Sequence, residues 1–225
     1  MITASTRLVA LLGQPVGRSL SPRMHNAAFA ALALDWAYVA LDVSPERLEE
    51  AVRGLAAAGF VGANVTAPHK LAAAELVATD VRSVNTLVFH AERIEGTSTD
   101  TAILDGLEIE RPVVLGDGGA ARAFLEALPQ ARSFARRGHW PPEVDDADLV
   151  VNATAARDEV LVELREGQTL VDLPYPATAT ARAARDAGAR VLDGHDVLVA
   201  QGAASFALWT GLPAPVDVLR AALQP

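Results

Sequence analysis

The chain has 225 residues, of which 51% are hydrophobic, with 28 acidic and 19 basic side chains and no cysteine. This apolar content excludes a disordered chain, and the lack of cysteine excludes a secreted scaffold held by disulfides. The formal charge of −9 argues against nucleic acid or an anionic membrane as a partner. The length allows one large domain or two small ones.

In the first part of the chain, short apolar runs alternate with longer amphipathic segments. Strands are predicted at residues 7–12, 36–43 and 60–65, helices at 22–34, 45–58 and 70–77, and a hairpin from 84–90 with 93–96. Ser21 and Ser44 are the predicted N-caps of the first two helices, because a serine hydroxyl can accept from a free first-turn amide. Pro22 fits the first helical position.

The same alternation resumes after a loop of mixed charge at residues 100–111. Strands are predicted at 112–115, 131–135, 147–151, 170–173 and 189–192, and helices at 119–128, 178–187, 196–209 and 214–223. Strands that alternate with helices predict an α/β fold with parallel sheets. We expect two domains, one formed by residues 1–100 with 206–225 and the other by residues 101–205.

One stretch invites a membrane interpretation, since residues 197–216 contain no charged side chain. Its length would suit a spanning helix, but glycines, prolines and polar residues interrupt it, so a buried helix followed by a turn is the better interpretation. The apolar run at residues 8–12 is too short for the core of a signal peptide. We therefore expect a cytoplasmic protein with no membrane partner.

A glycine-rich segment follows the strand predicted at 112–115. Residues 116–122 read G-D-G-G-A-A-R and open the next predicted helix. A strand, a glycine turn and a helix start together form a phosphate site, although the same pattern also suits a purely structural turn. Asp117 would repel a pyrophosphate unless its carboxylate points outward. Arg136 and Arg137 end the next strand, where an arginine suits the 2′-phosphate of NADP; a solvated turn is the alternative.

The only lysine of the chain is Lys70, while the other 18 basic residues are arginine. Lysine can take part in proton transfer, whereas arginine stays protonated in proteins. Composition alone does not separate this role from chance.

Four segments of the first hundred residues are dense in small polar groups at predicted strand ends. They are residues 13–26, 62–70, 83–86 and 98–100. Polar side chains just beyond apolar strands are where α/β sheets bind ligands. Hydroxyls, carboxamides, one ammonium and one carboxylate suit a small polyol acid.

These segments resemble motifs of the shikimate dehydrogenase family. They match G-x-P-x-x-x-S-x-S-P-x-x-H-N and G-x-N-V-T-x-P-x-K, and match A-V-N-T and N-T-D with one change each. Further on, residues 116–120 resemble the G-A-G-G-A loop, 150–154 match V-N-A-T, 172–175 match D-x-x-Y, and 198–211 match the closing helix. The motifs occur in family order over nearly the whole chain.

The resemblance implies an N-terminal α/β substrate domain and a trimmed Rossmann-like NADP-binding domain, in an enzyme of aromatic amino-acid biosynthesis that reduces 3-dehydroshikimate to shikimate with NADPH. Lys70 and Asp100 would be the catalytic pair. The implied substrate residues are Ser19 and Ser21 for the carboxylate, Asn64, Thr66, Asn85 and Gln201 for ring hydroxyls, and Tyr175 over the ligand. The implied cofactor residues are Gly116, Gly118, Gly119, Ala120, Arg136, Thr154 and Gly194.

The chain also departs from the family pattern, mostly on the cofactor side. The family has a longer insert between Lys70 and Asn85, and a further helix and strand where this chain has only residues 137–148. Ser83 and Ser98 replace the Ala of A-V-N-T and the Asn of N-T-D. A second hypothesis is therefore a paralogue that binds a shikimate-like ligand but has lost efficient cofactor binding. The five histidines show no metal-ligand spacing, and neither the oligomeric state nor the choice between shikimate and quinate follows from the sequence.

Overall fold

The computed structural model describes residues 2–224, which form two compact units. Unit 1 contains the residues up to Thr99 together with those from Val199 onward, and unit 2 is Asp100–Leu198. The units divide after Thr99 and again after Leu198, within helix α6 (Gly194–Thr210), which is continuous through that position.

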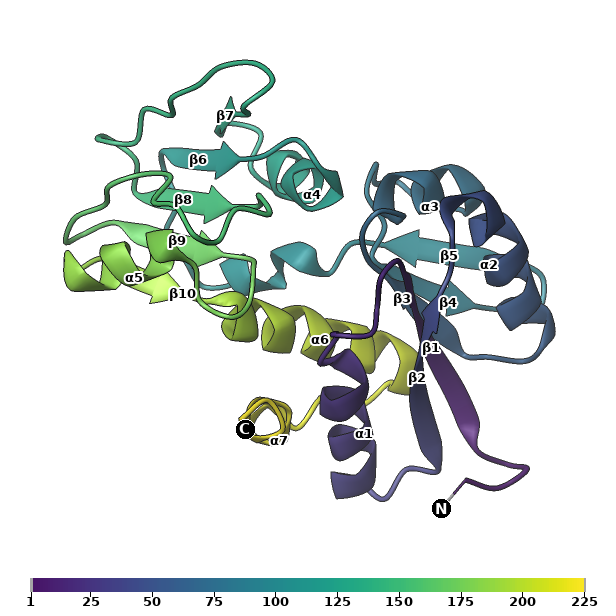
Figure 1. Cartoon of the computed structure of the whole chain (residues 1–225). Coiled ribbons are helices and arrows are strands. Elements are labelled where there is room, and N and C mark those ends of the chain that lie inside the picture. The colour runs from purple at the N-terminus through teal and green to yellow at the C-terminus, as the bar shows by residue number, and fades with distance from the viewer. Residues whose placement is uncertain (1, 225) are drawn as a thin grey trace. The chain divides into compact units, whose positions relative to one another are not determined.

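Unit 1 is built around a mixed five-stranded sheet with the order β2-β1-β3-β4-β5 (Figure 1). Its strands are β1 (Arg7–Gly13), β2 (Trp36–Asp42), β3 (Gly62–Val65), β4 (Thr86–Phe89) and β5 (Ile94–Thr97). Its helices are α1 (Ser21–Ala31), the 3₁₀ turn η1 (Pro45–Arg47), α2 (Leu48–Ala57), α3 (Lys70–Leu76), most of α6, and α7 (Val216–Ala221). Strand β1 is parallel to both neighbours, and β4 and β5 form the predicted antiparallel hairpin.

Apolar residues cover both faces of this sheet. Leu48 and Val52 of α2 and Ala73 of α3 pack in one cluster with Ala10 and Leu12 of β1. Aromatic rings from α1 and α6 pack together elsewhere in the unit, with Phe29 and Phe206 at 5.4 Å between ring centres. All residues of β3, the middle strand of the sheet, are buried, as expected for a strand that is covered on both sides.

Unit 2 contains a fully parallel sheet with the order β10-β9-β8-β6-β7. Its strands are β6 (Pro112–Leu115), β7 (Arg132–Phe134), β8 (Leu149–Asn152), β9 (Thr169–Asp172) and β10 (Arg190–Leu192). Its helices are the 3₁₀ turn η2 (Asp100–Leu104), α4 (Gly119–Ala127), α5 (Ala179–Asp186) and the start of α6. This is a doubly wound order that lacks the third strand of a six-stranded dinucleotide fold, so β7 is an edge. The predicted trimmed Rossmann-like domain is confirmed.

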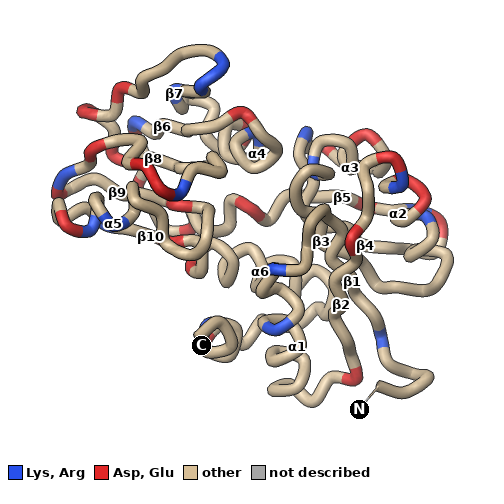
Figure 2. The backbone as a smooth tube through the Cα atoms, in the orientation of Figure 1, with Lys and Arg blue, Asp and Glu red and all other residues tan. Residues whose placement is uncertain are grey.

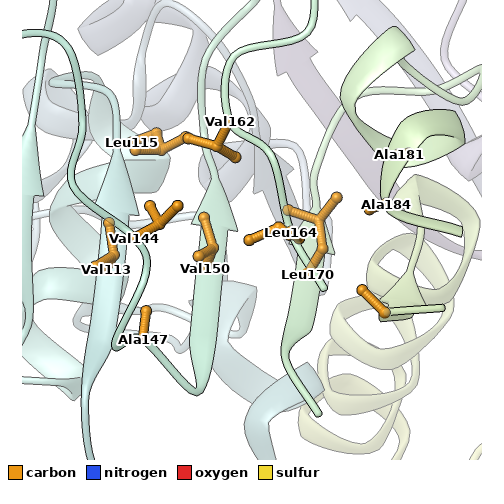
Figure 3. Packing of buried hydrophobic residues seen from close by; sticks show 11 residues of the cluster. Val113, Leu115, Val144, Ala147, Val150, Val162, Leu164, Leu170, Ala181 and Ala184 are labelled. Carbon is orange, nitrogen blue, oxygen red and sulfur yellow. The ribbon is translucent and has the colours of Figure 1, made fainter. Parts of the chain in front are cut away.

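The trimming affects one face of the unit 2 sheet. No helix or strand lies between residues 135 and 148 or between 153 and 168. Val144 from the first connection and Val162 and Leu164 from the second instead pack with Val113 and Val150 of the sheet (Figure 3). Two extended segments thus provide the apolar cover that a helix provides in a full-length domain. The side chain of Gln168 links them, donating to the carbonyls of Val144 at 2.8 Å and Ala147 at 2.7 Å.

Two details of the helices differ from the predictions. Helix α1 begins at Ser21, not after it, with Leu20 at the N-cap position and no side-chain capping bond; the hydroxyl of Ser19 accepts from the Ser21 amide at 3.3 Å. The predicted helix 45–58 begins as the η1 turn, and Ser44 makes no capping hydrogen bond. Among residues 2–224, no helix is long and apolar enough to cross a membrane.

Candidate active site

The first candidate site lies in unit 1, at the carboxyl ends of β1 and β3. The strand order reverses between these two strands, which is where open α/β sheets bind ligands. The loops that follow them are joined by the amide of Gln14, which donates to the carbonyl of Ala67 at 3.1 Å, and by the amide of Thr66, which donates to Leu12 at 2.8 Å. Gly13 allows this approach, because a Cβ there would collide with the Thr66 side chain. The loop that carries Ser19 and Ser21 and the loop that begins with Thr66 therefore leave the sheet at the carboxyl ends of neighbouring strands.

Lys70 is the first residue of α3 and is half-buried. Its carbonyl accepts from the amide of Val84 at 3.0 Å, so the start of α3 is tied to the segment that carries Asn85. The preceding residue, His69, is buried, and its Nε2 lies 2.7 Å from the carbonyl of Val43. Because a carbonyl only accepts, Nε2 carries the proton. The backbone around Lys70 is thus fixed from both sides.

Asn64 and Asn85 lie in a buried hydrogen-bond network beneath this edge. Asn64 Nδ2 donates to the Asn85 carbonyl, Thr86 Oγ1 and Ser205 Oγ, all at 3.1 Å. The contact with a carbonyl fixes the orientation of the Asn64 amide, so Tyr38 Oη donates to Asn64 Oδ1, at 2.8 Å. The donors of Asn64 are used by the protein, which leaves its oxygen as the group with capacity for a ligand hydroxyl.

Asn85 connects the network to the hairpin and to α6. Its Oδ1 accepts from the amide of Thr99 at 2.7 Å, and its Nδ2 lies 3.0 Å from Thr99 Oγ1 and 3.5 Å from Gln201 Oε1. Asp100 follows Thr99 directly, so this bond fixes the backbone one residue before the predicted catalytic carboxylate. Asp100 itself is buried and opens η2 of unit 2.

Tyr38, Thr99 and Ser205 also belong to this network, and none of them is among the site residues predicted from the sequence. Their hydroxyls come from β2, the end of β5 and α6, and no spacing in the sequence connects three segments so far apart. The one feature of the sequence that could have indicated this network is that Thr86 and Thr99 occur within the quoted motifs. Ser205 Oγ lies 2.8 Å from Thr86 Oγ1 and 3.0 Å from Thr99 Oγ1, so helix α6 is bonded into the site that Gln201 was predicted to reach.

A second candidate site lies in unit 2, at the carboxyl ends of β6 and β8, where its strand order also reverses. Gly116 has a φ of +119°, and a Cβ there would lie 2.9 Å from the carbonyl oxygen of Ala153, so the loop after β6 requires glycine. A Cβ at Gly118 would meet nothing within 4 Å, and α4 begins at Gly119. Open space above free first-turn amides fits a pyrophosphate group. Asp117 is exposed, so its carboxylate is in solvent.

Thr154 lies on the neighbouring loop, and its hydroxyl is already bonded within the protein. It donates to Asn152 Oδ1 at 2.7 Å and accepts from the amide of Ala156 at 3.2 Å. Asn152 in turn donates to Asp172 Oδ1 at 2.7 Å, and Thr178 Oγ1 donates to Asp172 Oδ2 at 2.9 Å. This buried chain connects the loops after β8 and β9 to the start of α5.

Asp172 is the ionisable group of that chain and is fully buried. Burial raises its pKa, the hydrogen bonds from Asn152 and Thr178 oppose that shift, and Asp193 adds to it. The sequence analysis quoted Asp172 only as part of a motif, without a role. The structure makes it the support for the loop that carries Tyr175.

Tyr175 and Gly194 meet within unit 2. The ring of Tyr175 lies 5.8 Å from that of His195 between centres. Gly194 is buried, and a Cβ there would collide with the Pro174 carbonyl. Close packing of α6 against the Tyr175 loop therefore accounts for this glycine without a ligand, and its predicted contact with the cofactor stays a prediction.

Arg136 lies two residues beyond β7, in a loop whose basic residues are visible in Figure 2. It forms an ion pair with Glu159, and its guanidinium carbon lies 5.4 Å from the ring centre of Trp140. Among residues 2–224, no cluster of three or more potential ligands could hold a metal ion.

Sequence comparisons agree with this architecture. Residues 11–87 match the family model of the shikimate dehydrogenase substrate binding domain, and residues 194–224 match that of the shikimate 5′-dehydrogenase C-terminal domain. A shikimate dehydrogenase (NADP(+)) from Anaeromyxobacter sp. strain Fw109-5 is 43% identical over 272 positions, covering 99% of this chain and 98% of the relative. The chain belongs to the shikimate dehydrogenase family. Because that alignment is longer than the chain's 225 residues, the relative carries positions that this member lacks.

Solved structures of the family are similar over the same extent. A crystal structure of a shikimate dehydrogenase in complex with NADP+ has a TM-score of 0.89 and 30% identity, covering 99% of this chain and 96% of that one. The Thermus thermophilus enzyme in complex with NADP(H) and shikimate has a TM-score of 0.85 and 30% identity, covering 96% and 98%. The shortened family member therefore keeps the family fold.

Proposed function

We propose that this protein is an NADP-dependent shikimate dehydrogenase that reduces 3-dehydroshikimate to shikimate. The observation that carries the proposal is the edge of the unit 1 sheet, where the Ser19–Ser21 loop and the Lys70 loop begin above a buried carboxamide and hydroxyl network. The relatives and structures named above support an active dehydrogenase over a binding paralogue. We keep the cytoplasmic location as a prediction.

We assign the unit 1 residues by the needs of the substrate. The hydroxyls of Ser19 and Ser21 bind its carboxylate, and Thr66 and Gln201 bind ring hydroxyls. Asn64 accepts from a ring hydroxyl through Oδ1, since its donors are bonded within the protein. Tyr175 of unit 2 closes over the ligand. This set of neutral donors and acceptors suits the uncharged ring hydroxyls of a polyol.

Reduction of a ketone requires a hydride on carbon and a proton on the developing alkoxide. Bound NADPH supplies the hydride. Lys70 donates a hydrogen bond to the oxygen, stabilises its charge and passes a proton, and the carboxylate of Asp100 accepts from the ammonium and keeps it in place. Arginine could not replace lysine here, because it does not release its proton. This requirement gives the only lysine of the chain a chemical reason.

The residues of unit 2 suit the cofactor. The glycine loop and the first turn of α4 would hold the pyrophosphate, with contacts from Gly116, Gly118, Gly119 and Ala120. Arg136 would bind the 2′-phosphate, and Thr154 and Gly194 would line the site. The helix missing after β7 changes the cover of one sheet face, while the glycine loop keeps its open space.

The test is turnover and binding by the purified chain. We expect NADPH oxidation with 3-dehydroshikimate, followed by absorbance at about 340 nm, with NADH and quinate as comparisons. Lys70→Ala and Lys70→Arg should each lower kcat by about 10²–10⁴-fold, the usual contribution of a general acid, while calorimetry shows shikimate still bound. Arg53→Ala, on the exposed face of α2, is the control and should leave kcat unchanged.

Two results would count against this function. Unchanged kcat in Lys70→Ala removes the catalytic assignment of that residue. Shikimate binding without any NADPH binding in the wild-type chain supports the paralogue instead.

A further inference from the structure

Glu159 holds the arginine that faces the expected 2′-phosphate position. It forms an ion pair with Nη2 of Arg136, and the two side chains are 50% and 57% exposed. Trp140, from the helix-free connection after β7, lies beside the same guanidinium at 5.4 Å. All three residues belong to unit 2; Trp140 lies on the connection between β7 and β8 and Glu159 on the connection between β8 and β9, and neither connection contains a helix.

The position of Glu159 is fixed by its backbone. Thr180 Oγ1, in the first turn of α5, donates to the Glu159 carbonyl at 3.3 Å and accepts from the amide of Leu161 at 3.0 Å. The amide of Ala179 donates to the carbonyl of Arg157 at 2.7 Å. The carboxylate is therefore attached to an anchored segment beside Arg136.

We propose that Glu159 is a specificity-determining residue that lowers the preference of this protein for NADP over NAD. The proposal rests on the proposed role of Arg136. A guanidinium has five N–H donors on three nitrogens, and Glu159 contacts Nη2, which leaves the donors of Nε and Nη1 for a 2′-phosphate. A phosphate bound there would have a fixed carboxylate close by, on the same cation. NAD carries a neutral 2′-hydroxyl at this point, so the repulsion acts on NADP alone.

The experiment compares two probes that differ only in the 2′-phosphate. Adenosine 2′,5′-bisphosphate and adenosine 5′-monophosphate are titrated into the full chain by calorimetry. Glu159→Gln should tighten binding of the bisphosphate by about fivefold, the size expected for repulsion between exposed charges, and should leave the monophosphate unchanged. The gain should shrink at high salt, because exposed charges are screened.

The control is Glu108→Gln, which makes the same charge change on an exposed residue before the amino end of β6, whereas the glycine loop follows its carboxyl end. It should not change the affinity for either probe. Unchanged or weaker bisphosphate binding in Glu159→Gln overturns the role of Glu159. If Arg136→Ala fails to weaken the bisphosphate in the wild-type background, the assigned 2′-phosphate site itself is wrong, and this inference falls with it.

Discussion

A buried histidine makes the stability of unit 1 depend on pH. His25 lies on α1 and is fully buried, with its ring stacked on Tyr38 at 4.6 Å and close to Trp209 at 5.4 Å. Neither ring nitrogen has a hydrogen-bond partner among residues 2–224. Burial lowers its pKa from 6.5 to about 3, because no acceptor compensates the imidazolium for lost hydration.

The sign follows from the direction of this shift. The folded chain keeps His25 neutral, whereas the unfolded chain binds a proton as the pH falls below about 6.5. The stabilisation is therefore complete above that pH and is lost as the pH falls toward the folded-state pKa. One pKa unit corresponds to about 1.4 kcal/mol, so the full loss approaches roughly 5 kcal/mol, and between about pH 7.5 and pH 5 it is about 2 kcal/mol.

The assay is urea unfolding followed by tryptophan fluorescence, since Trp36 and Trp209 both report on unit 1. We expect His25→Leu to lose about 2 kcal/mol less than wild type on moving from about pH 7.5 to about pH 5. His90→Leu, an exposed histidine of the hairpin turn, is the control. Equal losses in wild type and His25→Leu would refute a buried, neutral His25.

Three further substitutions test the packing and the network. Gly62→Ala should destabilise the protein by about 1–3 kcal/mol, because its Cβ would meet the backbone of β4 and the indole of Trp209. Gly54→Ala, on α2, has open space around its Cβ and should stabilise the protein by up to about 1 kcal/mol. Urea midpoints that shift in the same direction in both variants would contradict this. Tyr38→Phe removes the donor to Asn64 Oδ1 and should cost about 1–2 kcal/mol, measured in the same way, and no loss would mean that this bond contributes nothing.

The fold was largely predictable because the strands of both units are short, apolar and separated by amphipathic segments. Helix starts were less accurate. The hydroxyl that accepts from the first amide of α1 belongs to Ser19, and propensity alone could not favour it over Ser21, the residue adjacent to Pro22. The division of α6 between the two units could not be located from the sequence for a related reason, since a continuous apolar helix carries no local mark where it passes from one unit to the next.

The loops of the candidate site were predictable, but its internal bonding was not. Each motif predicted which side chains lie at a strand end. None indicated that the Asn64 donors are consumed by Thr86 and Ser205, or that the Asn85 carbonyl fixes the amide so that its oxygen faces Tyr38. Those bonds join residues as far as 141 positions apart, and only the fold brings them together. The orientation of Asn64, which decides whether it accepts or donates, is therefore a structural result.

The position of the missing helix explains how the unit 2 sheet can be trimmed without loss of its cofactor edge. In a parallel sheet, each connection leaves a carboxyl end, crosses one face and returns to an amino end. The glycine loop belongs to the β6–α4 connection, which is intact, while the shortened connections run over the face covered by Val144, Val162 and Leu164. Shortening them changes how that face is buried, but it leaves β6 and β8 paired and the reversal of strand order unchanged. The trimming should thus lower stability before it lowers cofactor affinity.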